Sequence, residues 1–175
     1  MPEEESQEAV DLSDYPFPFI ENNVANFIMI IGEDASPDDA IAATDILLSL
    51  SYSSGESSVE PIDVPSPVLD TKVDNIYAQN TIIVGNPCVN NAAAELLGVT
   101  AEEPECTEGF EEGKAKIKLF QGIQGQGNNV ILLVAGYDNL RTRMASKVLQ
   151  NYNEYDLHGE EVIVSGESLE DINIQ

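Results

Sequence analysis

Three short apolar segments of the chain end in glycine, and each is followed by a turn and by a stretch with helical periodicity. The segments span residues 27–31, 81–84 and 130–135, and the glycines are Gly32, Gly85 and Gly136. Uniformly apolar strands that alternate with helices are typical of a parallel sheet covered on both faces. The pattern therefore predicts an α/β fold, with a mainly parallel central sheet from three βα units and helices on both faces.

Polar residues beside these segments indicate where the helices begin and end. Ser36 is a preferred N-cap, and Pro37 suits the first position of a helix that runs to about residue 51. Gly98 is placed to end a second helix, over about 89–97. Asp138 is expected to cap a third helix, which runs to about residue 151.

Polar and apolar residues alternate from Lys114 to Leu119, which is the pattern of a half-buried strand. Glycines between 122 and 127 indicate a hairpin loop, so we expect this strand to be an antiparallel addition to the sheet. Two further strands are expected, a short one near 59–64 and a last one at 161–165. Prolines interleaved with aromatics at 15–19 predict an extended segment laid in a hydrophobic groove.

The distribution of acids and apolar residues predicts three parts of the chain. Residues 1–14 carry six acids and no base, so we expect a solvated, mobile arm. Residues 15–165 are expected to form a single α/β domain, and residues 166–175 a C-terminal tail.

Net charge narrows the possible partners. The 175 residues include 7 Lys plus Arg and 32 Asp plus Glu, which gives a formal net charge of −25, while 42% of the residues are hydrophobic. The apolar fraction is normal for a folded protein. Such a surface repels phosphate backbones and anionic lipid head groups, so neither nucleic acid nor an anionic membrane surface is expected as a partner.

The strand-end glycines raise the possibility of a nucleotide-dependent enzyme, because backbone N–H groups at helix starts bind phosphate. Gly32, however, is followed by the acids Glu33, Asp34, Asp38 and Asp39. Neither phosphate-binding glycine motif occurs between a predicted strand and a predicted helix. The only histidine, His158, lies in a polar turn, which offers no two-histidine metal site and no hydrolase triad. We therefore expect no catalytic residues.

Two clusters of charge are candidate sites. Glu33, Asp34, Asp38 and Asp39 could bind a hard cation such as calcium, although helix capping and solvation explain the same residues. No other cofactor is expected. Lys114, Lys116 and Lys118 share one face of their predicted strand. They form either a solvated face or a cationic strip that contacts an acidic neighbouring subunit. The residues Cys88 and Cys106 could form one disulfide or remain two inert thiols.

Between residues 14 and 164 the chain resembles the euryarchaeal S-layer protein family, whose members tile the cell surface. The most specific part runs from Leu133 to Asp138, with the sequence LVAGYD, and continues with NYNEY at 151–155. Asn86 stands where the family tends to have a second glycine before Pro-Cys. The other matching segments are 14–19, 31–36, 40–45, 69–71, 83–90, 95–98, 142–145 and 148–149.

This resemblance implies a secreted, non-enzymatic structural protein of the archaeal cell surface that acts through self-assembly in a cation-containing exterior. It implies that Cys88 and Cys106 are paired. The expected partners are other copies of the chain or other surface-layer subunits, in an oligomer, lattice or filament. The N-terminus has neither the positive start nor the apolar core of a signal peptide, so we expect that a signal has been removed. The alternative functions are an extracellular glycan- or calcium-binding module and a nucleotide-dependent enzyme.

Overall fold

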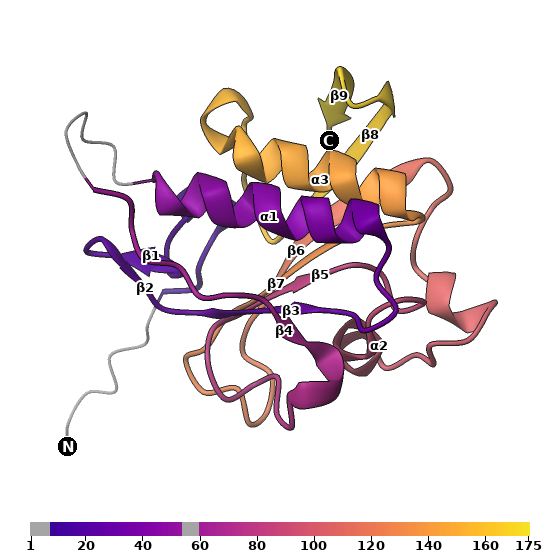
Figure 1. Ribbon diagram of the computed structural model, residues 1–175, viewed down its shortest axis with the longest axis horizontal. Coiled ribbons are helices and arrows are strands. Elements are labelled where there is room, and N and C mark those ends of the chain that lie inside the picture. The colour runs from indigo at the N-terminus through magenta and orange to yellow at the C-terminus, as the bar shows by residue number, and fades with distance from the viewer. Residues whose placement is uncertain (1–7, 54–59) are drawn as a thin grey trace.

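The computed structural model describes residues 8–53 and 60–175 and contains a mixed sheet of seven strands (Figure 1). The order across the sheet is β4-β3-β5-β7-β6-β8-β9. The bounds are β3 Ile28–Ile31, β4 Val68–Leu69, β5 Thr81–Val84, β6 Lys114–Phe120, β7 Ile131–Gly136, β8 Glu161–Ser168 and β9 Asp171–Ile174. Together with three α-helices, this sheet confirms the α/β class.

The sheet divides into a parallel half and an antiparallel half. Strands β4, β3, β5 and β7 are parallel, with Ile30 opposite Ile83 and Ile83 opposite Leu133. Strand β6 pairs antiparallel with both β7 and β8, and β8 pairs antiparallel with β9. The antiparallel addition is therefore three strands, where the sequence pattern predicted one from the alternation at 114–119.

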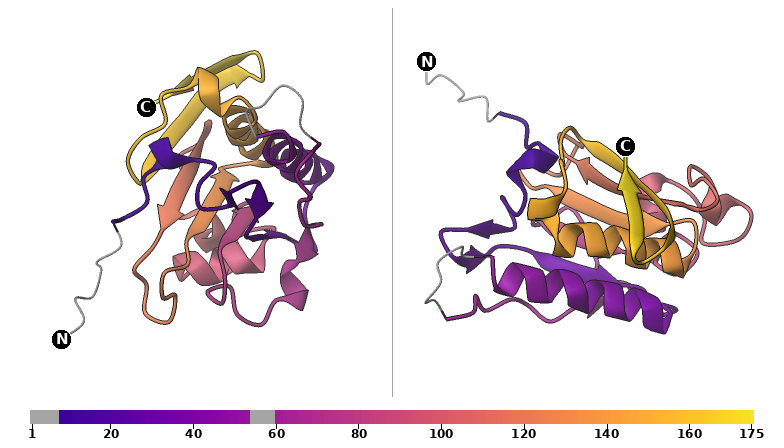
Figure 2. Two further views of the ribbon diagram at one scale, coloured as in Figure 1. Left: turned by 90° about the vertical axis from the view of Figure 1, so that its left-hand side faces the viewer. Right: turned by 90° about the horizontal axis from the view of Figure 1, so that it is seen from above.

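The helices lie on opposite faces of this sheet. Helices α1 (Pro37–Ser51) and α3 (Asn139–Gln150) lie side by side on one face, and α2 (Asn91–Leu97) lies on the other (Figures 1 and 2). Ile46 and Val148 pack with Ile82 in the core under α1 and α3. Ala93 packs with Ile83 in the second core, under α2.

The predicted caps begin and end these helices. Ser36 and Asp39 form a reciprocal capping box at the start of α1, and the side chain of Asp138 accepts a hydrogen bond from Arg141 N at the start of α3. Gly98 ends α2 in the left-handed conformation, with φ of 67°. Asn90 caps α2, so this helix begins two residues later than predicted.

The described end of the predicted acidic arm is attached to the domain. Leu12, in the 3-10 helix η1 (Leu12–Asp14), is buried, and its N–H donates to Gly159 O at 2.8 Å. The backbone of Val10 exchanges two hydrogen bonds with the side chain of Gln121. The prediction of a mobile arm is therefore wrong for residues 8–14, and residues 1–7 lie outside the described part.

Residues 15–19 form a series of turns, not the predicted extended segment. The N–H of Phe17 donates to Asp14 O, and that of Phe19 donates to Pro16 O. Tyr15 and Phe19 are buried in the same core as α1 and α3. A small hairpin of β1 (Ile20–Glu21) and β2 (Val24–Ala25) follows.

The last residues and the first irregular stretch also differ from the predictions. Strand β8 extends three residues beyond the predicted strand, and β9 forms the edge of the sheet, so residues 166–175 are not a tail. Residues 60–64 form no strand, and residue 59 lies outside the described part. The strand of this region is β4. In residues 8–53 and 60–175, no helix has the length and apolar character needed to span a membrane.

Candidate functional site

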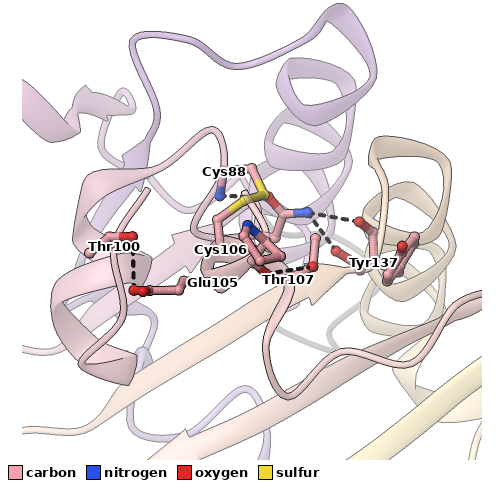
Figure 3. The surroundings of a disulfide bond; sticks show 9 residues. Cys88, Thr100, Glu105, Cys106, Thr107 and Tyr137 are labelled. Atoms are coloured by element: carbon pink, nitrogen blue, oxygen red, sulfur yellow. Dashed lines mark hydrogen bonds between the residues drawn. A yellow bond between two sulfur atoms is a disulfide. The ribbon is translucent and has the colours of Figure 1, made fainter. Parts of the chain in front are cut away.

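The two cysteines form a disulfide at the carboxyl end of the parallel strands. Cys88 lies in the turn between β5 and α2, and Cys106 lies in the 3-10 helix η3 (Glu105–Thr107). Their Cα atoms are 4.9 Å apart, and Cys106 is fully buried (Figure 3). The pairing that the family resemblance implied is therefore present in the structure.

Asn86 connects the disulfide turn to the neighbouring strand. Its amide donates to Gly136 O and Tyr137 O, both at 3.0 Å, and its side-chain oxygen accepts from Cys88 N at 3.0 Å (Figure 3). A glycine at this position would make none of these three bonds, because it has no side chain. Asn86 thus fixes the end of β5 against the end of β7.

Asp70 is a buried acid for which the sequence analysis found no role. Its Oδ1 accepts from the N–H groups of Glu33 and Thr71, at 2.9 and 2.8 Å. Its Oδ2 accepts from the backbone and the side-chain amide of Asn91, at 2.7 and 2.9 Å. Asp70 therefore holds the turn after β3 against the start of α2. The segment 69–71 resembles the family, but nothing in its local pattern indicated these distant partners.

The four acids predicted as a cation site have separate roles. Glu33 and Asp34 are exposed. Asp38 forms an ion pair with Arg143 at 3.2 Å, and Asp39 is buried in the capping box of α1. Within the described residues, no three His, Cys, Asp or Glu side chains are grouped to hold a metal ion. The structure therefore does not bring the four acids together around one ion, and calcium binding stays a prediction.

The three lysines of β6 lie on one face of the sheet and have partners in the same molecule. Lys114 pairs with Glu111 at 2.8 Å, and Lys118 pairs with Glu161 at 3.4 Å. Lys116 donates to Gly109 O and lies 4.8 Å from the ring centre of Phe110. Burial lowers the pKa of Lys116, and Lys118 adds to this effect while Glu161 opposes it. These contacts favour a structural role over a cationic strip that is free to contact a neighbour.

Replacing Lys114, Lys116 and Lys118 together by glutamate is expected to destabilise the monomer. The variant loses two ion pairs and the contact with Phe110, and it adds charge beside Glu161, so we expect a loss of about 2 kcal/mol. Urea unfolding measures it. A matched variant with glutamine at the three positions should lose less, because it adds no repulsion. A glutamate variant as stable as the parent chain would contradict the structural role.

The strand-end glycines allow close backbone packing. A Cβ added to Gly32 would overlap the carbonyl oxygen of Val89, and one added to Gly136 would overlap Arg141 and the N–H of Thr142. The starts of α2 and α3 therefore approach the strand ends directly. This packing accounts for Gly32 and Gly136 without a bound phosphate.

A cleft lies at the carboxyl ends of β3, β5 and β7. Its volume is about 370 Å³, and it is lined by residues from the turns after the three strands and from the segment that holds Cys106. Ser36 is the N-cap of α1 and Asp39 lies in its first turn, while Asn86 comes from the turn after β5 and Asp138 from the turn after β7. Ligands of open α/β sheets bind at this end of the strands.

Comparison with known proteins assigns the chain to a family. The profile described as "S-layer like family, outer domain" matches residues 48–153, which is more than half of the chain. No curated protein matches. The matched region runs from the end of α1 to the turn after α3, and it includes the disulfide and Asp70. The family points to a structural protein of the cell surface, and the chain belongs to the S-layer like family.

Proposed function

We propose that this chain is a non-enzymatic structural domain of a surface layer, which associates with further copies of itself through the outer face of α1. Membership in the S-layer like family supports the structural role. The observation that carries the choice of surface is an apolar stripe, with one half-buried acid, on a strongly acidic protein.

The outer face of α1 exposes large apolar side chains at helical spacing. Ile41, Leu48 and Tyr52 are 40%, 51% and 68% exposed, and they follow one another at intervals of seven and four residues. This spacing places them on one side of the helix over roughly 16 Å. The one charged residue between 40 and 52 is Asp45, which is half-buried and lies four residues after Ile41 and three before Leu48.

Charge indicates a second copy as the occupant of this stripe. Each copy carries a formal charge of −25, so two copies repel one another wherever acidic surfaces meet. Contact through the stripe brings in a single half-buried carboxylate, that of Asp45, and removes apolar area from water. A basic partner would bind more favourably to the acidic surfaces, through ion pairs. A second acidic copy binds most favourably to the α1 stripe.

The setting that we infer is the cell exterior. Disulfides persist in oxidising compartments, and the Cys88–Cys106 pair is in keeping with export. Cations in that exterior screen the repulsion between acidic copies within about 8–10 Å at moderate ionic strength. Assembly through the α1 stripe therefore depends on salt without needing a specific ion.

Sedimentation of the full chain at rising concentration, in about 0.05 M and about 0.5 M salt, tests this proposal. We expect association that strengthens with salt, because the contact is apolar and the repulsion is screened. Leu48→Glu should weaken association at least about tenfold, since it places a carboxylate in the contact. Val24→Glu is the matched control, because Val24 is an exposed valine of β2 and is not part of α1.

Three results would contradict the proposal. A chain that stays monomeric at high salt does not self-associate. Association that weakens with salt is held by ion pairs. In that case the lysines of β6 would be the contact between copies. Equal effects of Leu48→Glu and Val24→Glu would show that α1 is not the contact.

The rival binding functions have less support. A second cavity, of about 580 Å³, lies beside Phe17 and is lined otherwise by acids, amides and small apolar residues. Glycan modules usually present stacked rings, and Phe17 is the only aromatic residue here. A calcium module needs grouped oxygen ligands, and no three acidic side chains of the described residues are grouped to hold a metal ion.

A further inference from the structure

Asp39 has a buried carboxylate oxygen that makes no hydrogen bond to any described residue. The residue is only 1% exposed. Its Oδ2 accepts from Ser36 N at 3.0 Å and from Ser36 Oγ at 2.8 Å, which completes the capping box. Its Oδ1 has no partner among the described residues. A desolvated carboxylate oxygen without a donor is costly, so this atom needs a donor from outside the described chain.

Asp39 lines the cleft at the carboxyl ends of the parallel strands. A Cβ built on Gly85 would lie 4.0 Å from Oδ1, which places the atom beside the end of β5. Strands β3 and β5 are neighbours, yet α1 and α2, which follow them, lie on opposite faces of the sheet (Figure 1). Helices that diverge in this way open a crevice at the strand ends, where α/β proteins bind ligands.

The charges around the cleft favour a cation. Its lining contains the carboxylates of Asp39, Glu103 and Asp138 and no Lys or Arg. Asp138 pairs with Arg141 at 3.5 Å, while Asp39 and Glu103 form no ion pair with a described residue. The positive ends of α1 and α3 are already occupied by their capping acids. In a chain of charge −25, a cleft of this kind concentrates positive ligands.

The arrangement suits an organic cation better than a metal ion. The cleft lacks three acids grouped around one point, which holds for all the described residues. The unpartnered atom is an acceptor in need of a hydrogen-bond donor, and a primary ammonium carries three N–H donors on a compact charge. Serine, asparagine and threonine side chains in the lining add further acceptors. We propose that this cleft binds a primary ammonium group, with Asp39 Oδ1 as the anchoring acceptor.

The ammonium can come from a free amine or from a lysine of another copy. Four of the five lysines are engaged within the described chain: Lys114 and Lys118 with acids, Lys116 with Gly109 O, and Lys147 with Gln150. Lys72 is exposed and forms no ion pair with a described residue. A lysine that inserts into the cleft of the next copy would make a head-to-tail contact. This source rests on the proposed self-association, whereas binding of a free amine does not.

Titration of the full chain with n-butylammonium chloride tests the site, followed by NMR shifts at the carboxyl ends of the strands. We expect saturable binding that tetramethylammonium chloride does not reproduce, because that cation has the same charge and no N–H donor. Asp39→Asn should weaken binding at least tenfold. Asp45→Asn is the matched control: Asp45 lies on the same helix and also has a buried oxygen without a described partner, but it lies outside the cleft.

The other outcomes either contradict the site or identify the source of the ammonium group that it binds. Equal responses to the two ammonium salts would mean charge screening alone, and saturable calcium binding lost in Asp39→Asn would mean a metal site; either overturns the proposal. If Asp39→Asn does not fold, Glu103→Gln should weaken n-butylammonium severalfold, and an unchanged affinity would count against the cleft. If the chain self-associates, and if both added n-butylammonium and the Lys72→Gln substitution dissociate it, the natural ligand of the cleft is a lysine of another copy. If the chain stays monomeric but binds the amine, the ammonium site is supported and only the proposed self-association through α1 is contradicted.

Discussion

Replacing Gly32 by alanine is expected to destabilise the fold by at least about 3 kcal/mol. The added Cβ would overlap the carbonyl oxygen of Val89, which is backbone in the turn that begins α2. Neither side can move without disturbing Asn90, whose amide bonds Ile30 O and Val84 O from that turn. For a chain of this length, the melting temperature should fall by roughly 6–12 °C.

Gly127→Ala separates the close contact from the general effects of the substitution. Gly127 has φ of 59°, and nothing lies within 4 Å of an added Cβ. Alanine in this left-handed conformation costs about 1 kcal/mol. Gly32, with no positive φ, would instead gain a few tenths of a kcal/mol from alanine if no atom stood in the way. Urea unfolding of both variants distinguishes the cases, and a Gly32→Ala chain as stable as Gly127→Ala would show that α2 shifts freely.

The sequence pattern predicted the elements whose signals are local. The runs before Gly85 and Gly136 are apolar enough to identify buried strands, and Ser36, Asp138 and Gly98 have the chemistry of helix ends. Strands β4 and β9 were missed for a physical reason. They are short edge strands whose conformation comes from pairing with β3 and β8, which no local periodicity records.

The candidate site was less predictable because its key residues act over long distances. Asp39 has the sequence signature of a helix cap, and one of its oxygens has that role. The residue also lines the cleft, only because β3, β5 and β7 bring their following turns together. Asp70 and Asn86 likewise bond groups 21 to 51 residues away. In an acid-rich chain, single carboxylates of this kind do not stand out until the fold places them.

Removing the disulfide with Cys88→Ala and Cys106→Ala is expected to lower stability by about 3 kcal/mol. The bond closes a loop with a sequence separation of 18 residues, and loop closure of this size removes conformational entropy from the unfolded chain. The segment 99–113 contains six acids, and within it Phe110 is the one large apolar side chain buried in a core. Once the bond is lost, this segment should open locally before the sheet unfolds.

Two measurements check this expectation. Urea unfolding gives the loss in the free energy of unfolding. Limited proteolysis shows where the chain opens, with new cleavage expected at 99–113 and none in β7. Glu102→Gln and Glu108→Gln in the same segment form the matched control, because they reduce its charge and leave the disulfide intact. Mass measurement with an alkylating agent under denaturing, non-reducing conditions should show no added label. Two labels on the parent chain without reductant would refute the disulfide. They would also remove the main structural support for a location outside the cell, since reduced thiols of this kind are typical of the cytosol.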